Sequence, residues 1–559
     1  MTGNAQAKSQ SLVRLLGIAF FAAVISLAWL RFSENTADND LWGHVLYGQR
    51  YWNLGQVRCG EAFSWTAPGF PVVNHEWLAE VIVGHVHRIG GGQGLWLYMV
   101  AMAAITLLPA MLVARGHNNK TSLAALALLG ASTNFIALGF AVRPQLFTTL
   151  CLVVELLLLR RFMALGEQRS EGNAQRDSLR QLLPLLPLPL LCGLWINLHG
   201  GVLAGMFVLT ALVGVSTAGA FLPARLTSAF PGWEFNRLSK VKLCGLWGAL
   251  LACAAALLAN PWGVDLLRWN VEASFRPRPM ILEWHPMVPS FANLPYFVVL
   301  AVSILAWLFS RLTRRPWEAA VLAMLALMGL LHQRHAPLFG VANLLFTTPH
   351  LADAALRLAP RLGALRKLAS VTAVQATVAA GLLVVAGWCA WLSVSSPRTQ
   401  PFTIEVERDM FPCAAIAHMK ERNLEGRTIT FFDWGQQFLW ELPRNPVSFD
   451  GRFDTGYPPA VYKAHWDFYA GKGFVPGVDW TQADLALLPT SNPGALHLLR
   501  SGDWLVSYRD PLAIVLVRRG SRHETTVRAA GTVVAGNEAL LGRERFPDAL
   551  PTLAWPHGK

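Results

Sequence analysis

Two neighbouring stretches decide the fold class of this chain: LVRLLGIAFFAAVISLAWLR (residues 12–31) and ADNDLWGHVLYGQRYW (residues 37–52). The first is an apolar run long enough to cross the hydrocarbon core of a membrane. It is longer than the apolar region of a signal peptide and lacks a small-x-small cleavage site behind it, so we interpret it as a retained helix. The second places two acids, Asp38 and Asp40, just beyond the predicted membrane edge.

The first 394 residues repeat this apolar pattern, and the whole chain is 53% hydrophobic with a mean hydropathy of +0.37. This composition predicts a polytopic α-helical membrane protein. The net charge of +13 does not indicate nucleic-acid binding, because the basic residues lie in short clusters between apolar runs. About eleven spans are expected, at residues 12–31, 93–114, 121–141, 144–165, 182–198, 200–221, 241–260, 294–311, 317–333, 336–351 and 369–394.

The connections between these spans alternate in charge. Every second one is basic, as at Arg160 and Arg161 after the fourth span and at Arg314 and Arg315 after the eighth. Basic connections face the cytoplasm, so the N-terminus is expected inside and residues 395–559 outside. The span at 336–351 contains two prolines, which a helix tolerates in a membrane only where neighbours satisfy the freed carbonyls.

The opposite set of connections carries polar side chains that are unusual at a membrane edge. They occur in the motifs VRPQLF, WINLHGG, NPWG, LEWHP and HQRHAP. Each alone has an ordinary explanation, because His and Trp are common at the interface and a single Arg can snorkel. Together they predict a site assembled from several helices on the outer face. The candidate binding residues in these motifs are Arg143, Gln145, Asn197, His199, Glu283, Arg334 and His335.

The first outer loop, residues 32–92, holds the most candidates. Apolar residues at helical spacing in its stretch 37–52 predict an amphipathic helix along the membrane surface, with Asp38 and Asp40 at the N-terminus. Acids at that position also suit the helix dipole, so a purely structural role is an alternative.

A second short helix of this loop is predicted from the motif NHEWLAEVIVGHVHRI, with Asn74 as its N-cap. Glu76 and Glu80 are four residues apart and share one face of the helix. With His44 and His75 nearby, this acidic pair is compatible with general-base chemistry or with a divalent metal, and the spacing alone does not decide between them.

Beyond the last span, residues 395–559 alternate β-rich runs with helical stretches. The pattern predicts a small α/β domain with a mainly parallel sheet and a hairpin around Asp510. The motifs FFDWGQQ and SFDGRFD place Asp433 and Asp450 at strand ends, where open α/β sheets bind ligands. Asp and Gly also form turns readily, which is an equal alternative. Asp433, Asp450 and Arg452 are therefore candidate binding residues.

Two further features bear on function and stability. The chain contains no G-x-G-x-x-G motif and no P-loop, so we expect no nucleotide. Cys59 and Cys413 are the two cysteines predicted to lie on the outer side, and a disulfide between them is a hypothesis.

The order of these motifs resembles the GT-C glycosyltransferases, which are multispan enzymes that take sugars from polyprenyl-phosphate carriers. The resemblance covers most of the chain and lies in DNDLWGH, FSWTAPG, NHEWLAE, RPQLF, NLHGG, NPWG, EWHP and DGRFD. GT-C enzymes keep a functional acid in the first outer loop, where Asp38 and Asp40 stand. Many relatives have two aromatics before the His, whereas this chain has Trp42 and Gly43 before His44.

The resemblance implies a glycosyltransferase in the bacterial cytoplasmic membrane, with a transmembrane domain at residues 1–394 and an extracytoplasmic domain at 395–559. Asp40 would take the proton of an acceptor hydroxyl, because desolvation raises the pKa of a carboxylate toward useful values. Asp38 would orient the acceptor or hold a divalent metal, with Asp40 as the other possible metal ligand, since some members of the superfamily need one. In-line attack would invert the anomeric centre.

The resemblance also implies the binding partners. Arg143 and Arg334 would neutralise the leaving phosphate of a polyprenyl-phosphate sugar, with His335 or His199 as further candidates. The acceptor would be a glycan, a lipid or a protein, and membrane lipids would surround the spans. The alternatives are a noncatalytic scaffold or a transporter of lipid-linked glycans. A transporter would be expected to show internal repeats, and the sequence has none that we find.

Overall fold

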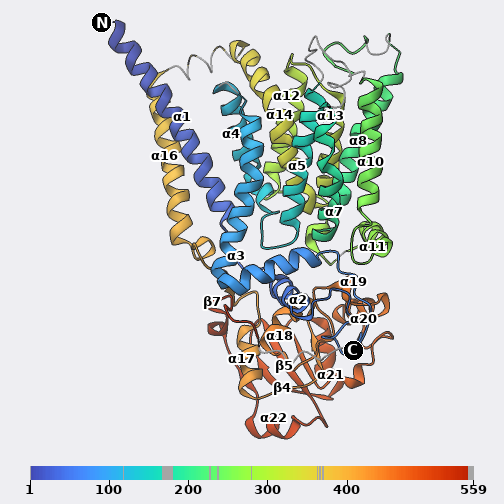
Figure 1. Cartoon of the computed structure of the whole chain (residues 1–559). Helices are drawn as coiled ribbons and strands as arrows, with labels where there is room; N and C mark the ends of the chain where they lie inside the picture. The colour runs from blue at the N-terminus through green and yellow to red at the C-terminus, as the bar shows by residue number, and fades with distance from the viewer. Residues whose placement is uncertain are drawn as a thin grey trace. The chain divides into compact units, whose positions relative to one another are not determined.

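The structure is a computed structural model that describes residues 2–116, 119–165, 180–223, 225, 228–235, 238–278, 280–361, 363, 367 and 371–551 (Figure 1). By its internal contacts the chain divides into two compact units. The helical unit comprises Met1–Glu34, Tyr98–Gly263 and Asn270–Pro401. The α/β unit comprises Asn35–Leu97, Val264–Trp269 and Phe402–Lys559, so the first outer loop clusters with the C-terminal part of the chain.

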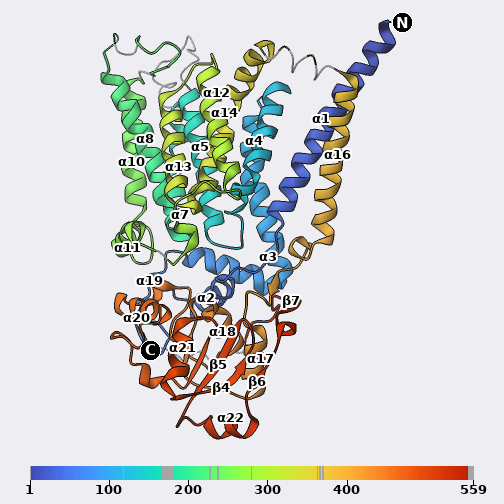
Figure 2. The same ribbon diagram turned by 180° about the vertical axis from the view of Figure 1, so that it is seen from behind.

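A helix covers each of the predicted spans. In the helical unit, α1 and α16 run side by side in both views (Figures 1 and 2). The long helix α3 belongs to both units and contains a kink at Gly91, whose φ of 54° is easily adopted only by glycine. The helices are α1 (Thr2–Phe32), α3 (Trp77–Ala114), α4 (Asn119–Ala137), α5 (Gln145–Ala164), α7 (Pro187–Leu198), α8 (Val202–Phe221), α10 (Lys240–Ala256), α12 (Leu294–Phe309), α13 (Pro316–Leu331), α14 (Ala336–Leu358) and α16 (Thr372–Ser395). Residues 369 and 370 of the last predicted span lie outside the described residues.

The chain is a multi-pass membrane protein. Among the described residues, four helices are long and apolar enough to cross a membrane: Gln10–Phe32, Trp77–Ala114, Val202–Phe221 and Thr372–Ser395. Shorter apolar helical segments lie at Leu183–Leu198, Leu294–Phe309 and Pro316–Leu331. The number of eleven crossings and their orientation therefore stay predictions.

The proline-containing span at 336–351 is a continuous helix, because α14 runs through Pro349 to Leu358. Pro349 has no N–H to donate to the carbonyl of Leu345, one turn earlier. Arg160 of α5 donates its Nη1–H to that carbonyl instead, at 2.6 Å. A neighbouring helix thus satisfies the freed backbone oxygen, as a membrane-embedded proline requires.

The α/β unit contains a mixed five-stranded sheet in the order β2-β3-β5-β4-β6. The expected hairpin is formed by β4 and β5, and Asp510 closes it by accepting the N–H groups of Leu512 and Ala513. The expectation of a mainly parallel sheet is wrong. The hairpin inserts β5 antiparallel between β3 and β4, so only the β2–β3 and β4–β6 pairs are parallel. The strands are β1 (Glu405–Glu407), β2 (Thr428–Thr430), β3 (Leu485–Pro489), β4 (Trp504–Arg509), β5 (Ala513–Arg518), β6 (Val533–Val534) and β7 (Arg543–Arg545). β1 pairs antiparallel with β7 in a separate two-stranded sheet.

Helices of the α/β unit come from three separated segments of the sequence. They are α2 (Leu41–Leu54), the first part of α3, the first half of α11 (Val264–Phe275), α17 (Cys413–Glu421), α18 (Gly435–Glu441), α19 (Phe453–Gly456), α20 (Pro459–Tyr469), α21 (Pro493–Ser501) and α22 (Glu524–Ala530). Cys59 and Cys413 are free thiols, so the hypothesised disulfide is not formed.

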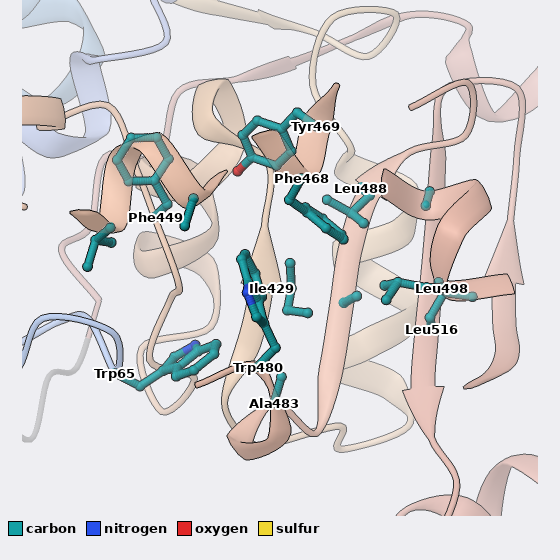
Figure 3. Close-up of a cluster of buried hydrophobic side chains, with 14 of the residues drawn as sticks. Trp65, Ile429, Phe449, Phe468, Tyr469, Trp480, Ala483, Leu488, Leu498 and Leu516 are labelled. Atoms are coloured by element: carbon teal, nitrogen blue, oxygen red, sulfur yellow. The ribbon is translucent and has the colours of Figure 1, made fainter. Parts of the chain in front are cut away.

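Trp65 of the first outer loop belongs to the main hydrophobic core of this unit. It clusters with buried residues of the sheet and its helices, among them Ile429, Phe449 and Leu516 (Figure 3). Its indole Nε1–H donates to the carbonyl of Thr428 in β2 at 3.1 Å. The loop is therefore a structural part of the α/β unit, joined to it by both apolar packing and a buried hydrogen bond.

The sequence predicted that α2 would be exposed on one face. That prediction is wrong, because every residue from Leu41 to Tyr51 is buried. The C-terminal segment covers it: the ring of Trp42 packs on Phe411 and Phe546 at centroid distances of 4.8 and 5.3 Å. Apolar spacing shows that one face is buried, but it cannot reveal a partner that covers the other face.

His465 on α20 is expected to make the stability of this unit depend on pH. Burial lowers the pKa of His465 to about 4, although its Nδ1–H donates to the carbonyl of Val461. The unfolded imidazole titrates near 6.5, so its neutral form contributes fully above that pH and the contribution is lost as the pH falls toward 4. We expect a loss of about 2 kcal/mol between pH 7 and pH 5.

This expectation is tested by thermal unfolding of the purified full chain in detergent, followed by tryptophan fluorescence at pH 7 and pH 5. In the His465→Leu variant the loss of stability between pH 7 and pH 5 should be smaller by the contribution of His465, because Leu has no proton to gain. An equal loss of stability in the parent and the variant would contradict the assignment.

Candidate active site

The acid pair of the first outer loop stands at the start of α2. The Oδ1 of Asp38 accepts the backbone N–H of Asp40 at 3.0 Å, which forms the turn that leads into the helix. Asp40 occupies the N-cap position, but its side chain makes no capping hydrogen bond. Its carboxylate lies against Gly451, because a Cβ placed on Gly451 would be 2.5 Å from Asp40 Oδ1. The carboxylate of Asp40 thus lies next to Gly451 and does not cap α2.

Two glycines bring α2 onto the first half of α3. A Cβ on Gly48 would overlap the backbone carbonyl of Glu80, and one on Gly84 would be 3.0 Å from the backbone nitrogen of Gln49. Only glycine permits this close approach of the two backbones. As a result, the Nδ1–H of His44 reaches Glu80 Oε1 at 3.2 Å.

Asn74 holds Glu80 in place from the loop before α3. Its amide donates to Glu80 Oε2 at 2.6 Å and to the hydroxyl of Tyr51 at 2.9 Å. Its Oδ1 accepts the backbone N–H of Glu76 at 2.8 Å, close to the capping role predicted for it, although α3 begins at Trp77. The loop geometry thus orients Glu80 toward His44.

His75 and Glu76 complete this cluster. His75 Nε2 lies 3.2 Å from Glu76 Oε1, and its ring stacks on Trp269 of α11 with centroids 4.3 Å apart. Trp269 is a site residue that the sequence did not reveal. The NPWG motif that precedes α11 was recognised, but nothing in it indicated which later side chain reaches the loop.

The charges in the cluster decide the protonation of His44. Burial by itself lowers the pKa of His44, but the hydrogen bond to Glu80 and the charges of Glu76, Glu80 and Asp40 outweigh it and raise the pKa to about 9. His44 is therefore a cation at neutral pH, paired with carboxylates.

One group of side chains in the described part of the chain could hold a metal ion. Ligand atoms of His44, Glu76 and Glu80 all lie within 4.8 Å of one another. One imidazole and two carboxylates suit a borderline divalent cation such as Zn²⁺, which would have to displace the proton from His44. Asp38 and Asp40, the metal ligands considered from the sequence, are not members of this group.

The DGRFD motif forms a buried ion cluster with the first outer loop. Arg452 pairs with Glu61 and with Asp450 Oδ2, the latter at 2.5 Å, and the side chains of both acids are fully buried. The hydroxyl of Tyr457 donates to Asp450 Oδ2 at 3.0 Å, and the guanidinium lies 5.0 Å from the ring centroid of Tyr47. Asp450 and Arg452 thus hold each other and the loop, and Glu61 is a partner that the sequence did not identify.

Gln436 of α18 lies against both Gly43 of α2 and Gly451 of the DGRFD motif. A Cβ on Gly43 or on Gly451 would overlap its side-chain amide, so the missing side chain at Gly43 leaves the room that Gln436 occupies. Gln436 is 4% exposed, and its Oε1 has no hydrogen-bond partner among the described residues. Asp433 is half-buried in the short turn Phe432–Trp434 that precedes α18.

In the helical unit, Glu283 joins two of the predicted phosphate-binding residues. Its Oε2 pairs with Arg143 Nη1 at 3.0 Å and its Oε1 with Arg334 Nη1 at 3.2 Å. The guanidinium of Arg334 also lies 4.6 Å from the ring centroid of Trp284. Burial and the charge of Arg334 lower the pKa of His335 to about 3, so His335 adds no positive charge at neutral pH.

The remaining predicted residues connect elements of the helical unit. Gln145 donates to the carbonyl of Leu138, and Asn197 donates to those of Gly193 and Ala259. His199 Nδ1 accepts from the hydroxyl of Thr148 at 2.8 Å and from the N–H of Gly201 at 2.9 Å. These hydrogen bonds give the motifs VRPQLF and WINLHGG a local structural role.

The predicted residues thus fall into two sets. In the α/β unit are Asp38, Asp40, His44, His75, Glu76, Glu80, Asp433, Asp450 and Arg452, and in the helical unit are Arg143, Gln145, Asn197, His199, Glu283, Arg334 and His335.

No protein-family model matches the chain, and no curated protein matches it either. Among solved structures, it is similar to an oligosaccharyltransferase of Archaeoglobus fulgidus tethered to an acceptor peptide that contains an NVT sequon. The identity is 13%, the match covers 86% of this chain and 69% of the other, and the TM-score is 0.49. The same enzyme in complex with Zn and sulfate matches with 14% identity over 85% and 68%, at a TM-score of 0.44.

The chain is also similar to ArnT from Cupriavidus metallidurans in the apo state, with 13% identity over 91% of this chain and 98% of that one and a TM-score of 0.44. Both similarities cover most of this chain. At these TM-scores the similarity carries no argument about the site, which rests on the residues described above.

Proposed function

We propose that this protein is a membrane glycosyltransferase that takes a sugar from a polyprenyl-phosphate carrier and passes it to an acceptor on the outer face of the cytoplasmic membrane. The observation that carries the proposal is the position of Asp40. This half-buried carboxylate starts α2 without capping it, and it adds to the charges that keep His44 protonated. An acid held in this way suits a base better than a helix anchor.

In this reaction Asp40 accepts the proton of an acceptor hydroxyl as its oxygen attacks the anomeric carbon. The new C–O bond forms while the bond from that carbon to the phosphate oxygen breaks, and its electron pair leaves with the phosphate. Attack opposite the leaving group inverts the anomeric centre. His44, held by Glu80, supplies a fixed positive charge that interacts with the negative charge of Asp40.

A divalent cation at His44, Glu76 and Glu80 would replace the proton of His44 and would then itself supply the positive charge near the base. Neighbouring side chains hold two of these ligands in place. Asn74 donates a hydrogen bond to Glu80, and His75, which stacks on Trp269, pairs with Glu76.

The phosphate of the donor would bind to Arg143 and Arg334. Both guanidinium groups pair with the same carboxylate, that of Glu283, so their N–H groups point toward one shared anion. As the leaving phosphate gains charge in the reaction, two fixed guanidinium groups stabilise it.

Arg143→Gln and Arg334→Gln are each expected to weaken the binding of a polyprenyl phosphate about tenfold, because each removes one charge-assisted contact at a partly exposed site. Farnesyl phosphate binding to the purified chain in detergent measures this effect. Arg311→Gln is the matched control, since this exposed arginine lies outside the cluster. Equal affinities for all three variants would remove the phosphate assignment.

A noncatalytic scaffold is the second candidate. The buried Glu61–Arg452–Asp450 cluster favours a scaffold, because this cluster gives the DGRFD motif a structural role without a ligand. A folded Asp40→Asn variant decides between the two: a scaffold would keep supporting glycan assembly, whereas a transferase would not.

A further inference from the structure

The carboxylate of Glu283 occupies the hydrogen-bond donors that a phosphate would need. Each of its two oxygens pairs with a different arginine, Arg143 at 3.0 Å and Arg334 at 3.2 Å. The three side chains are only partly exposed, at 31%, 20% and 18% respectively. An anion with two oxygens between two guanidinium groups has the geometry of a bound phosphate.

The segment that carries Glu283 is fixed beside the turn that carries Arg334. His332 Nδ1 donates to the carbonyl of Trp284 at 2.7 Å, and the backbone N–H of Gln333 donates to the carbonyl of His285 at 3.1 Å. These bonds follow Glu283 and precede Arg334 in sequence, and they hold the two backbone segments together.

Two arginines pack on the ring of Trp284, the residue after Glu283. The guanidinium of Arg278 lies 4.2 Å from the ring centroid of Trp284, and that of Arg334 lies 4.6 Å from it. Arg143 and Arg334 both pair with the carboxylate of Glu283, so two positive charges meet at this one side chain. Paired guanidinium groups of this kind attract anions.

We propose that Glu283 is an internal counter-anion that competes with the phosphate group of the donor and of the product for Arg143 and Arg334. This inference rests on the proposed function. A sugar phosphodiester carries one negative charge, so it can replace Glu283 without changing the net charge of the cluster. The product is a phosphomonoester with about 1.5 to 2 negative charges at neutral pH, and two arginines hold it more tightly.

The competition acts mainly on release of the product. Glu283 belongs to the same chain and returns to its arginines at a high effective concentration. It lowers the affinity for the phosphomonoester and lets the carrier lipid leave after transfer. Glu283 is then a residue that sets the affinity of the site and takes no part in the chemical step.

The test measures binding of two probes, farnesyl phosphate and inorganic phosphate, to the purified full chain in detergent. Glu283→Gln keeps the shape and removes the charge, so the dissociation constant should fall on the order of tenfold. Glu272→Gln, which neutralises an exposed acid of α11, is the matched control and should leave it unchanged. Tightening of both probes assigns the competition to the phosphate group, and tightening of farnesyl phosphate alone assigns it to a lipid-borne phosphate.

Unchanged or weaker binding by folded Glu283→Gln overturns the inference. Should that variant fail to fold, Glu283→Asp replaces it: the shorter carboxylate cannot reach both arginines, and a smaller tightening is expected. The outcome is separable from that of the proposed function. If Arg334→Gln weakens binding and Glu283→Gln does not tighten it, only the counter-anion fails, whereas an unaffected Arg334→Gln removes the phosphate site itself.

Discussion

Replacing Asp40 with Asn should lower sugar transfer by about two to four orders of magnitude while the binding of farnesyl phosphate persists. The amide keeps the size and shape of the carboxylate, so it still fits against Gly451. It cannot accept the proton of an acceptor hydroxyl at neutral pH. The effect should therefore appear in turnover, because the phosphate is assigned to arginines of the helical unit.

The assay follows transfer from synthetic polyprenyl-phosphate sugars into native membranes that contain the acceptor. Asp265→Asn is the matched control: it makes the same chemical change at an exposed acid of the same unit and should keep parental activity. If Asp40 only anchored the start of α2, the change would cost at most about 1 kcal/mol of stability and leave transfer near the parental rate. Near-parental transfer would thus return the acid pair to a structural role.

The largest loss of stability is expected from Arg452→Met. The side chains of Glu61 and Asp450 are fully buried, and Arg452 is the cation that pairs with both. Its removal leaves two buried carboxylates without their counter-charge, which typically costs about 3 to 5 kcal/mol. Asp450 directly precedes Gly451, which lies next to Asp40, so the α/β unit should loosen around the candidate base.

Unfolding of the full chain in detergent, followed by tryptophan fluorescence, measures this loss. The control is Arg408→Met, which breaks the exposed pair with Glu544 and should cost less than about 1 kcal/mol. A triple variant that also carries Glu61→Gln and Asp450→Asn should recover part of the stability, since no unpaired charge remains. If Arg452→Met and Arg408→Met lowered the free energy of unfolding by similar amounts, burial of the Glu61–Arg452–Asp450 cluster would contribute little to stability.

The sequence predicted the elements of the fold well because its signals are local. Apolar runs identified the helices, and turn residues identified the hairpin at Asp510. It did not predict that β5 would insert between β3 and β4, because strand order depends on packing between segments that are far apart. For the same reason the stretch 37–52 was interpreted as a surface helix, although the C-terminal segment covers α2.

The candidate site was predictable to a similar extent. The sequence indicated Glu76 and Glu80 as a pair on one helix face, and their cluster with His44 follows from the crossing at Gly48 and Gly84. It could not identify Gln436, because an amide inside a helix has no distinctive neighbours in sequence. The partners of Arg452 were also hidden, since Glu61 lies 391 residues away.

Trp65 has a consequence for biosynthesis. Its hydrogen-bond partner Thr428 follows 363 residues later in the chain, so the tryptophan emerges from the ribosome long before its core exists. At roughly 5 to 20 residues per second, the wait lasts about 20 to 70 s. During this time the loop lacks the partners that bury Trp65 in the finished chain. Folding of the first outer loop should therefore depend on synthesis of the C-terminal part of the α/β unit, and a nascent chain arrested before β2 should leave Trp65 open to protease digestion nearby.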